Sequence, residues 1–123
     1  MKILICEDDY MTLKALQHHL KKEGFDVEVT ANGREAIFKM DKSKFDLVLL
    51  DIHMPYMNGL EVINYIRNTR KSKVPIVVLS RVGLESTVQE AFSLGADDYI
   101  TKPFNPSELT TRLNRLLIND EKT

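Results

Sequence analysis

Several residues whose side chains could act on phosphate or on a metal ion each follow a short apolar segment. They are Glu7, Asp8 and Asp9 after residues 2–6, Asp51 after residues 47–50, Ser80 after residues 75–79, and Lys102, which precedes Pro103, after residues 98–101. A single carboxylate in such a place is usually a solvated loop residue or a helix cap. That these residues follow the ends of four segments, with none of them displaced to a segment start, indicates a shared site.

The residue types predict magnesium-dependent phosphoryl chemistry. Crowded carboxylates stay ionised only when a cation neutralises them. Hard oxygen ligands suit Mg²⁺, which keeps several water molecules and takes an oxygen from a phosphate. The Ser80 hydroxyl and the Lys102 ammonium could bind phosphoryl oxygens. Asp51 beside them could then act as a nucleophile and form an aspartyl phosphate.

The segments before these residues have the pattern of strands, at residues 2–6, 26–30, 47–50, 75–79 and 98–101. The first, third and fourth are almost wholly apolar, as in strands buried on both faces. The second alternates valines with acidic residues, which suits an edge. Three of the helical segments between them begin with Asn32, Asn58 and Asn105, each with a glutamate three residues later. This alternation predicts the α/β class, a doubly wound five-stranded parallel sheet with five helices, which binds ligands at the carboxyl ends of its strands.

The composition indicates one soluble domain. The chain has 123 residues, and its net charge of −1 argues against a basic nucleic-acid module. The single cysteine excludes an internal disulfide. No apolar run approaches the ~20 residues of a membrane span, and the first residues do not read as a signal peptide. We expect a cytoplasmic protein with its domain over residues 1–118, followed by residues 119–123 as a polar tail or the start of a linker.

Over essentially its whole length the sequence resembles the receiver domain of two-component response regulators. The resemblance rests on residues 3–9 (ILICEDD), 45–55 (FDLVLLDIHMP), 58–61 (NGLE), 75–80 (PIVVLS) and 95–104 (GADDYITKPF). It implies a flavodoxin-like fold with the strand order 2-1-3-4-5. Each segment is moderately specific, and the set is highly specific.

The resemblance implies a role for each residue that would contact phosphate. Asp51 is expected to accept a phosphoryl group from a histidine kinase, and Ser80 and Lys102 to bind the phosphoryl oxygens. Tyr99 is expected to be a switch residue that turns inward when Ser80 moves toward the phosphate. The peptide bond between Lys102 and Pro103 is expected to be cis, as X-Pro bonds sometimes are.

The resemblance also implies a magnesium site. Asp8 and Asp51 are expected to ligate Mg²⁺ directly, and Glu7 through a bound water molecule. The backbone carbonyl of His53 is expected to be a further ligand.

Other positions resemble the subfamily that carries a winged-helix DNA-binding domain. That subfamily dimerises through cross-subunit ion pairs on the face formed here by residues 84–94, 98–101 and 106–118. Asp98, Glu108 and Arg112 fit such pairs. Val88, Leu94 and Asn119 stand where a lysine, an acid and an arginine are expected. A homodimer through this face is therefore only partly supported.

Arg81 departs from the small residue that commonly follows the switch hydroxyl in the family. Its cation could gate access to the site, contact the phosphoryl group or point to solvent.

The preferred function is the receiver half of a DNA-binding transcription factor whose output domain is absent from this chain. The alternative is a stand-alone receiver that binds a target protein. A magnesium-dependent phosphohydrolase commonly needs a second aspartate two residues after the nucleophile, and His53 stands there. A phosphorylation-independent interaction module usually lacks site residues that this chain retains. We therefore expect no enzyme beyond catalysis of its own phosphorylation and dephosphorylation, with no membrane partner and no DNA contact by the receiver itself.

Overall fold

The computed structural model describes residues 1–54 and 57–122, and Pro55 and Thr123 lie outside the described residues. Five parallel strands form one sheet in the order β2-β1-β3-β4-β5. The strands are β1 (Lys2–Cys6), β2 (Asp26–Thr30), β3 (Leu47–Asp51), β4 (Ile76–Arg81) and β5 (Asp98–Lys102). The helices are α1 (Tyr10–Lys22), α2 (Gly33–Lys42), α3 (Gly59–Asn64), α4 (Glu85–Leu94) and α5 (Pro106–Lys122). The predicted fold class and strand order are confirmed.

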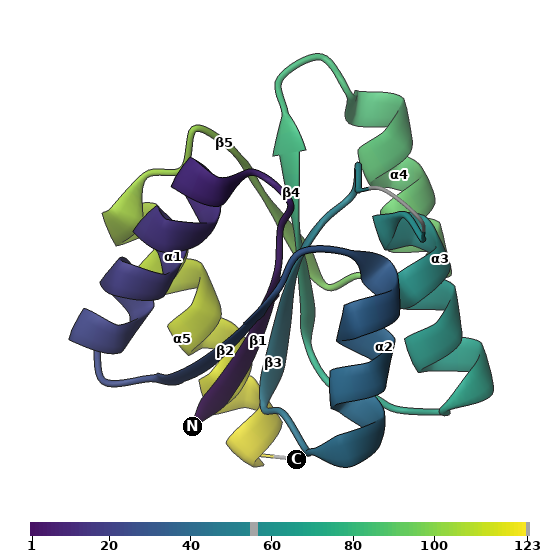
Figure 1. The fold of residues 1–123 in the computed structure, drawn as a ribbon, viewed down its shortest axis with the longest axis horizontal. Helices are drawn as coiled ribbons and strands as arrows, with labels where there is room; N and C mark the ends of the chain where they lie inside the picture. Colours follow the sequence, from purple (N-terminus) through teal and green to yellow (C-terminus); the bar gives the residue numbers. More distant parts are fainter. Residues whose placement is uncertain (55–56, 123) are drawn as a thin grey trace.

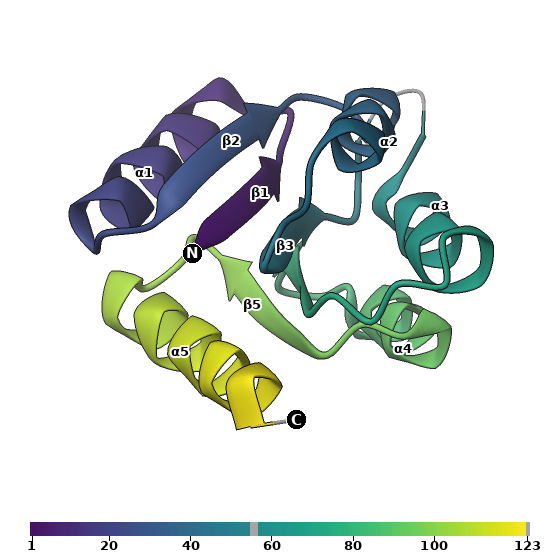
Figure 2. The same cartoon turned by 90° about the horizontal axis from the view of Figure 1, so that it is seen from below.

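Two layers of helices cover the sheet. α1 and α5 lie on one face, and α2, α3 and α4 lie on the other (Figures 1 and 2). The central strands feed both cores, because alternate residues point to opposite faces. Leu4 and Val48 pack in the core under α2, α3 and α4, whereas Ile3 and Leu47 pack in the core under α1 and α5. Residues 3–6, 47–50 and 76–79 of the central strands are therefore all apolar, which explains the unbroken apolar runs.

Side-chain caps begin three helices at the predicted asparagines. The Oδ1 atom of Asn32 accepts a hydrogen bond from the N–H of Glu35 at 3.0 Å. Asn58 and Asn105 accept equivalent bonds, also at 3.0 Å, from the residue three positions later. Each cap satisfies a backbone donor that has no partner inside its helix. The caps therefore fix where the loops after β2, β3 and β5 end.

Three strands extend one or two residues beyond their predicted ends. β3 includes Asp51, β4 continues to Arg81 and β5 continues to Lys102. The backbones of these residues are therefore held by the sheet rather than by flexible loops. α5 continues to Lys122, so the backbone of residues 119–122 is helical. Among the described residues, no helix has both the length and the apolar character that crossing a membrane requires.

Candidate functional site

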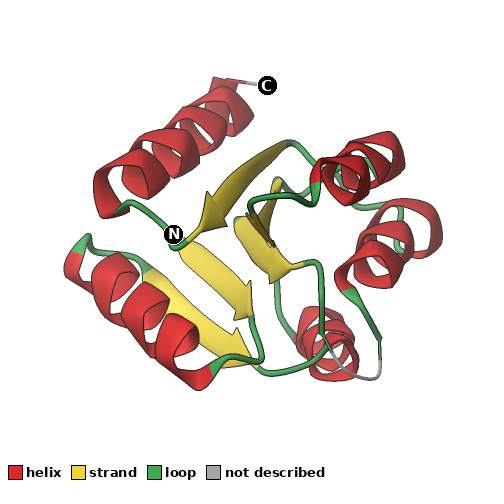
Figure 3. Cartoon of the chain, turned by 90° about the horizontal axis from the view of Figure 1, so that it is seen from above, coloured by secondary structure: helices red, strands yellow, loops and turns green. Residues whose placement is uncertain are grey.

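The carboxyl ends of the parallel strands share one edge of the sheet, and Figure 3 looks down on it. A cleft of about 470 Å³ lies at this edge. It is lined by Asp8, Asp9, Thr12, Asp51, His53, Arg81, Lys102 and Pro103. These residues come from β3, β4 and β5, from the segments that follow β1, β3 and β5, and from α1, far apart in the sequence. We call this space the carboxyl-edge cleft.

Lys102 is bound to two carboxylates at the base of this cleft. Its Nζ atom donates to Oε1 of Glu7 at 2.6 Å and to Oδ2 of Asp51 at 3.1 Å. The Glu7 side chain is 0% exposed and that of Lys102 is 18% exposed. The Oε2 atom of Glu7 is buried and has no hydrogen-bond partner. Lys102 therefore binds both carboxylates, and the Oε2 atom of Glu7 remains a buried acceptor without a hydrogen bond.

Burial and charge shift the proton affinities of this cluster. Burial, followed by the hydrogen bond and charge of Asp51, raises the pKa of Glu7 to about 8, although Lys102 opposes the shift. Burial lowers the pKa of Lys102, but its contacts with Glu7 and Asp51 outweigh burial and raise that pKa overall. The cluster therefore favours extra positive charge, either a proton on Glu7 or a bound cation.

The residues at the cleft fit a magnesium ion. Glu7, Asp8 and Asp51 each offer one carboxylate oxygen, and these three oxygens lie within 4.8 Å of one another. Asp8 is exposed, whereas the other two are buried. Oxygen donors of this kind are the ligands that Mg²⁺ takes in proteins. The unpartnered Oε2 of Glu7 is a second sign that one lysine does not complete the cluster.

His53 adds a main-chain contact to the nucleophile candidate. Its backbone N–H donates to Oδ1 of Asp51 at 3.1 Å. Both carboxylate oxygens of Asp51 are therefore engaged, one by this N–H and one by Lys102.

Asp9 borders the cleft but has a structural role. Its Oδ2 atom accepts hydrogen bonds from the backbone N–H and the hydroxyl of Thr12 at 3.0 and 2.5 Å, and so caps α1. The hydroxyl bond and then the backbone bond lower the pKa of Asp9. It lies outside the group of three carboxylates.

Ser80 and Tyr99 border a second cavity rather than the carboxyl-edge cleft. This cavity of about 440 Å³ is lined by Ser80, Arg81, Val82, Leu84, Glu85, Val88, Gln89, Phe92, Tyr99 and Thr101, and we call it the α4 cavity. The Ser80 hydroxyl donates to the carbonyl of Arg81 at 3.3 Å. Tyr99 is 39% exposed, and its ring meets that of Phe92 edge-on at 6.1 Å. Space beside Tyr99 is thus available for its ring.

The expected interface residues pair within the chain. Arg112 contacts Asp98 at 2.6 Å and Glu108 at 3.1 Å. The peptide bond between Lys102 and Pro103 is cis.

Arg67 makes contacts that its place in the sequence does not indicate. Its guanidinium donates to the carbonyls of Gly95 and Ser72 and to Asp97, at 2.9–3.0 Å. Asp97 also accepts from the backbone N–H of Ile76 at 2.8 Å. Arg67 therefore fastens the end of the α3 region to the starts of β4 and β5. No sequence spacing indicates this contact, because its partners lie up to 30 residues away.

A comparison with protein families identifies the family of this chain. The family described as the response regulator receiver domain matches residues 3–114. The chain belongs to this family. Receiver domains interact with histidine kinases, bind Mg²⁺ at an acidic pocket and are not conventional enzymes.

Similar receivers occur in transcriptional regulators and as separate domains. The chain is 38% identical to the transcriptional regulatory protein ResD of Bacillus subtilis, over 99% of the chain and 50% of that protein. It is 37% identical to the alkaline phosphatase synthesis transcriptional regulatory protein PhoP of the same organism, over 98% and 50%. The chain thus spans about half the length of these relatives.

Solved structures show the same fold. The chemotaxis protein CheY4 of Vibrio cholerae has a TM-score of 0.87 and 34% identity, covering 94% of this chain and 97% of that one. The receiver domain of the Francisella response regulator 1452 has a TM-score of 0.89 and 29% identity, covering 97% and 98%.

Proposed function

We propose that Asp51 accepts a phosphoryl group from a histidine kinase and that Ser80 and Lys102 bind it. The observation that carries the proposal is the position of Lys102, whose ammonium bridges Asp51 and the buried Glu7 at the base of an open cleft. This contact places a cation within 3.1 Å of an oxygen of the proposed nucleophile. It can therefore offset charge that develops on a transferring phosphoryl group.

The transfer needs only one bond to form and one to break. An Asp51 carboxylate oxygen attacks phosphorus, and the bond between phosphorus and the donor nitrogen breaks. The nitrogen takes the electron pair, so Asp51 neither gains nor loses a proton. The His53 N–H and Lys102 hold the carboxylate in place during attack.

The proposed magnesium ligands are Asp8, Asp51, the His53 carbonyl and, through water, Glu7. When bound there, Mg²⁺ supplies positive charge for the phosphoryl oxygens. Lys102 alone faces two acids, so it cannot also neutralise an incoming phosphoryl group with its charge of about −2.

The proposed switch begins at Ser80. When its hydroxyl turns to a phosphoryl oxygen, it leaves the Arg81 carbonyl that it contacts at 3.3 Å. The Tyr99 ring then has the α4 cavity of about 440 Å³ beside it to enter. This movement changes the face formed by α4, β5 and α5, a local charge event with a distant effect.

The proposed output is control of transcription through a DNA-binding domain that this chain lacks. It is supported by ResD and PhoP, which are transcriptional regulatory proteins about twice the length of this chain. We propose a cytoplasmic receiver over residues 1–118, with residues 119–123 leading to that domain. A homodimer through α4, β5 and α5 is part of the proposal. The alternative, a stand-alone receiver that binds a target protein, is supported by the single-domain likeness to CheY4.

The first experiment measures intact mass after incubation with acetyl phosphate. We expect one added phosphoryl group on the wild-type chain with Mg²⁺, and none without Mg²⁺ or in Asp51→Asn. The same adduct in Asp51→Asn would contradict Asp51 as the acceptor. No adduct on the folded wild type, together with no response of its melting temperature to beryllofluoride and Mg²⁺, would contradict the proposed function.

A further inference from the structure

Two cations end neighbouring strands at the carboxyl edge. Arg81 is the last residue of β4 and Lys102 the last of β5, and the two are register partners. Partners on adjacent parallel strands direct their side chains to the same face of the sheet. Arg81 and Lys102 therefore stand side by side, and both line the carboxyl-edge cleft.

The two cations differ in what already binds them. The Lys102 ammonium contacts Glu7 and Asp51 and is 18% exposed. Arg81 is exposed, and among the described residues no ion pair involves its guanidinium. It is the cation of this cleft that stays available to an incoming anion.

Arg81 also lies between the two spaces that a phosphoryl group would affect. It lines the carboxyl-edge cleft with Asp51, and it lines the α4 cavity with Ser80 and Tyr99. Its own carbonyl accepts the Ser80 hydroxyl. A guanidinium presents several N–H donors in a planar fork that matches phosphate oxygens.

The charge balance of the cleft indicates what the Arg81 guanidinium could do there. Four acids, Glu7, Asp8, Asp9 and Asp51, lie at this edge. Within the part of the chain that the structure describes, Lys102 is the one cation that forms an ion pair with any of them, and it pairs with Glu7 and Asp51. Such an edge repels a donor whose phosphoryl group carries about two negative charges. A free cation at the open side reduces this repulsion at the place where the donor enters.

We propose that Arg81 binds phosphoryl oxygens from the open side of the cleft, while Lys102 binds them from the buried side. Arg81 then acts on the small anionic phosphodonor before transfer and on the aspartyl phosphate after it. This inference rests on the proposed function of Asp51. It makes Arg81 a determinant of how well this receiver uses acyl phosphates.

The test compares Arg81→Ala, Arg81→Lys and Arg115→Ala in the 123-residue chain. Arg115 is an exposed arginine on α5 outside the cleft, so its loss changes the net charge equally. We expect Arg81→Ala to lower the second-order rate constant for acetyl phosphate about three- to tenfold at low ionic strength. Arg81→Lys should lie between it and the wild type, and Arg115→Ala within about twofold of the wild type. High salt should reduce these differences in rate constant, because it screens the charge of the arginine.

A second measurement does not depend on turnover. With Mg²⁺ and beryllofluoride, we expect the rise in melting temperature to be smaller in Arg81→Ala than in Arg115→Ala. Rates and melting shifts in Arg81→Ala equal to or above the wild type would overturn the inference and leave Asp51 chemistry intact. No adduct in the wild type and no beryllofluoride response would overturn both.

Discussion

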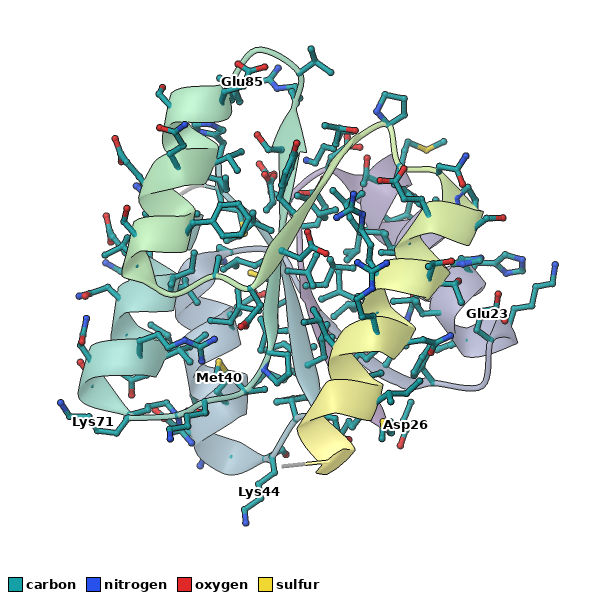
Figure 4. The ribbon with its side chains drawn as sticks, turned by 180° about the vertical axis from the view of Figure 1, so that it is seen from behind. Glu23, Asp26, Met40, Lys44, Lys71 and Glu85 are labelled. Atoms are coloured by element: carbon teal, nitrogen blue, oxygen red, sulfur yellow. The ribbon has the colours of Figure 1, made fainter. Side chains whose placement is uncertain are left out.

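Two polar clefts lie at opposite ends of the sheet, and they differ in how deeply their charged side chains are buried. At the base of the carboxyl-edge cleft, Lys102 bridges Asp51 to Glu7, whose side chain is fully buried. The other, the amino-edge cleft, has a volume of about 350 Å³ and is lined by Met40, Ser43, Lys44, Phe45, Asp46, Arg70, Ser72, Lys73, Val74 and Pro75. Figure 4 shows Lys44 and Lys71 at the end of the molecule opposite Glu85.

The amino-edge cleft is lined by four charged residues, against five at the carboxyl edge, and most of its charges face solvent. Lys44, Arg70 and Lys73 are exposed. The Arg70 ion pair with Asp41 has side chains that are 34% and 47% exposed. Water solvates these charges, so ion pairs with neighbouring residues contribute little to stability. At the carboxyl edge, Glu7, Asp51 and Lys102 are largely buried and depend on one another, as is common where a protein performs chemistry. The number of charges is similar, and their burial distinguishes the two clefts.

Removing one cation from each cleft tests this difference. We expect Lys102→Met to lower the free energy of unfolding by about 2–3 kcal/mol at pH 8.5 without metal, because Asp51 and Glu7 lose their buried partner. Arg70→Met should change it by less than about 0.5 kcal/mol. Urea denaturation followed by circular dichroism measures both.

The pH dependence of the unfolding free energy of Lys102→Met provides the control for this prediction. At pH 6 the loss in Lys102→Met should shrink, because Glu7 then holds a proton and carries no charge. Equal losses of unfolding free energy in Lys102→Met and Arg70→Met would show that the burial of charge does not distinguish the two clefts.

Glu7→Gln tests the buried acid directly. The pKa of about 8 that Glu7 has in the folded chain lies above the ordinary glutamate value of 4.5. Between these two pH values the folded chain therefore holds a proton that the unfolded chain has released. The stability that comes from this proton is complete below about pH 4.5 and is lost as the pH rises to about 8. Relative to Glu7→Gln, the metal-free wild type should lose at most about 1.4 kcal/mol per pH unit across this range.

Urea titrations in EDTA at several pH values measure this relative slope. Millimolar Mg²⁺ should restore stability to the wild type at pH 8 more than to Glu7→Gln, because a bound cation stabilises the folded state. Parallel pH profiles for the two proteins would contradict a raised pKa at Glu7.

The sequence was sufficient for the sheet and for the grouping of Glu7, Asp8 and Asp51, because strand ends in a parallel sheet must share an edge. The sequence was insufficient for Asp9, which caps α1, because an aspartate that caps a helix and an aspartate that ligates a metal are the same residue type. It also missed Arg67, since a basic residue at a helix end looks solvated until tertiary structure brings Gly95 and Asp97 to it. Local patterns predict local structure, and contacts between distant segments need the folded chain.

The smallest predicted effect lies beside the amino-edge cleft, at Lys71. Lys71 has a φ of 56°, the only positive φ of a non-glycine residue in the described chain. The next N–H, of Ser72, donates to the carbonyl of Ile66 at 2.9 Å, which closes the helix end in the way that usually places glycine at this position. At the end of α4, Gly95 occupies the left-handed conformation.

Lys71→Gly should therefore raise the free energy of unfolding by about 0.5–1 kcal/mol, the left-handed penalty less the added entropy of the unfolded chain. Phosphorylation by acetyl phosphate should stay at the wild-type rate, because Lys71 is exposed at the end of the molecule opposite the carboxyl edge. Lys73→Gly is the matched control, since Lys73 has no positive φ, and it should be neutral or destabilising. A loss of stability in Lys71→Gly would mean that the lysine side chain stabilises this loop. The strain here belongs to a helix end, whereas the unpartnered Oε2 atom of Glu7 at the carboxyl edge belongs to the proposed magnesium site.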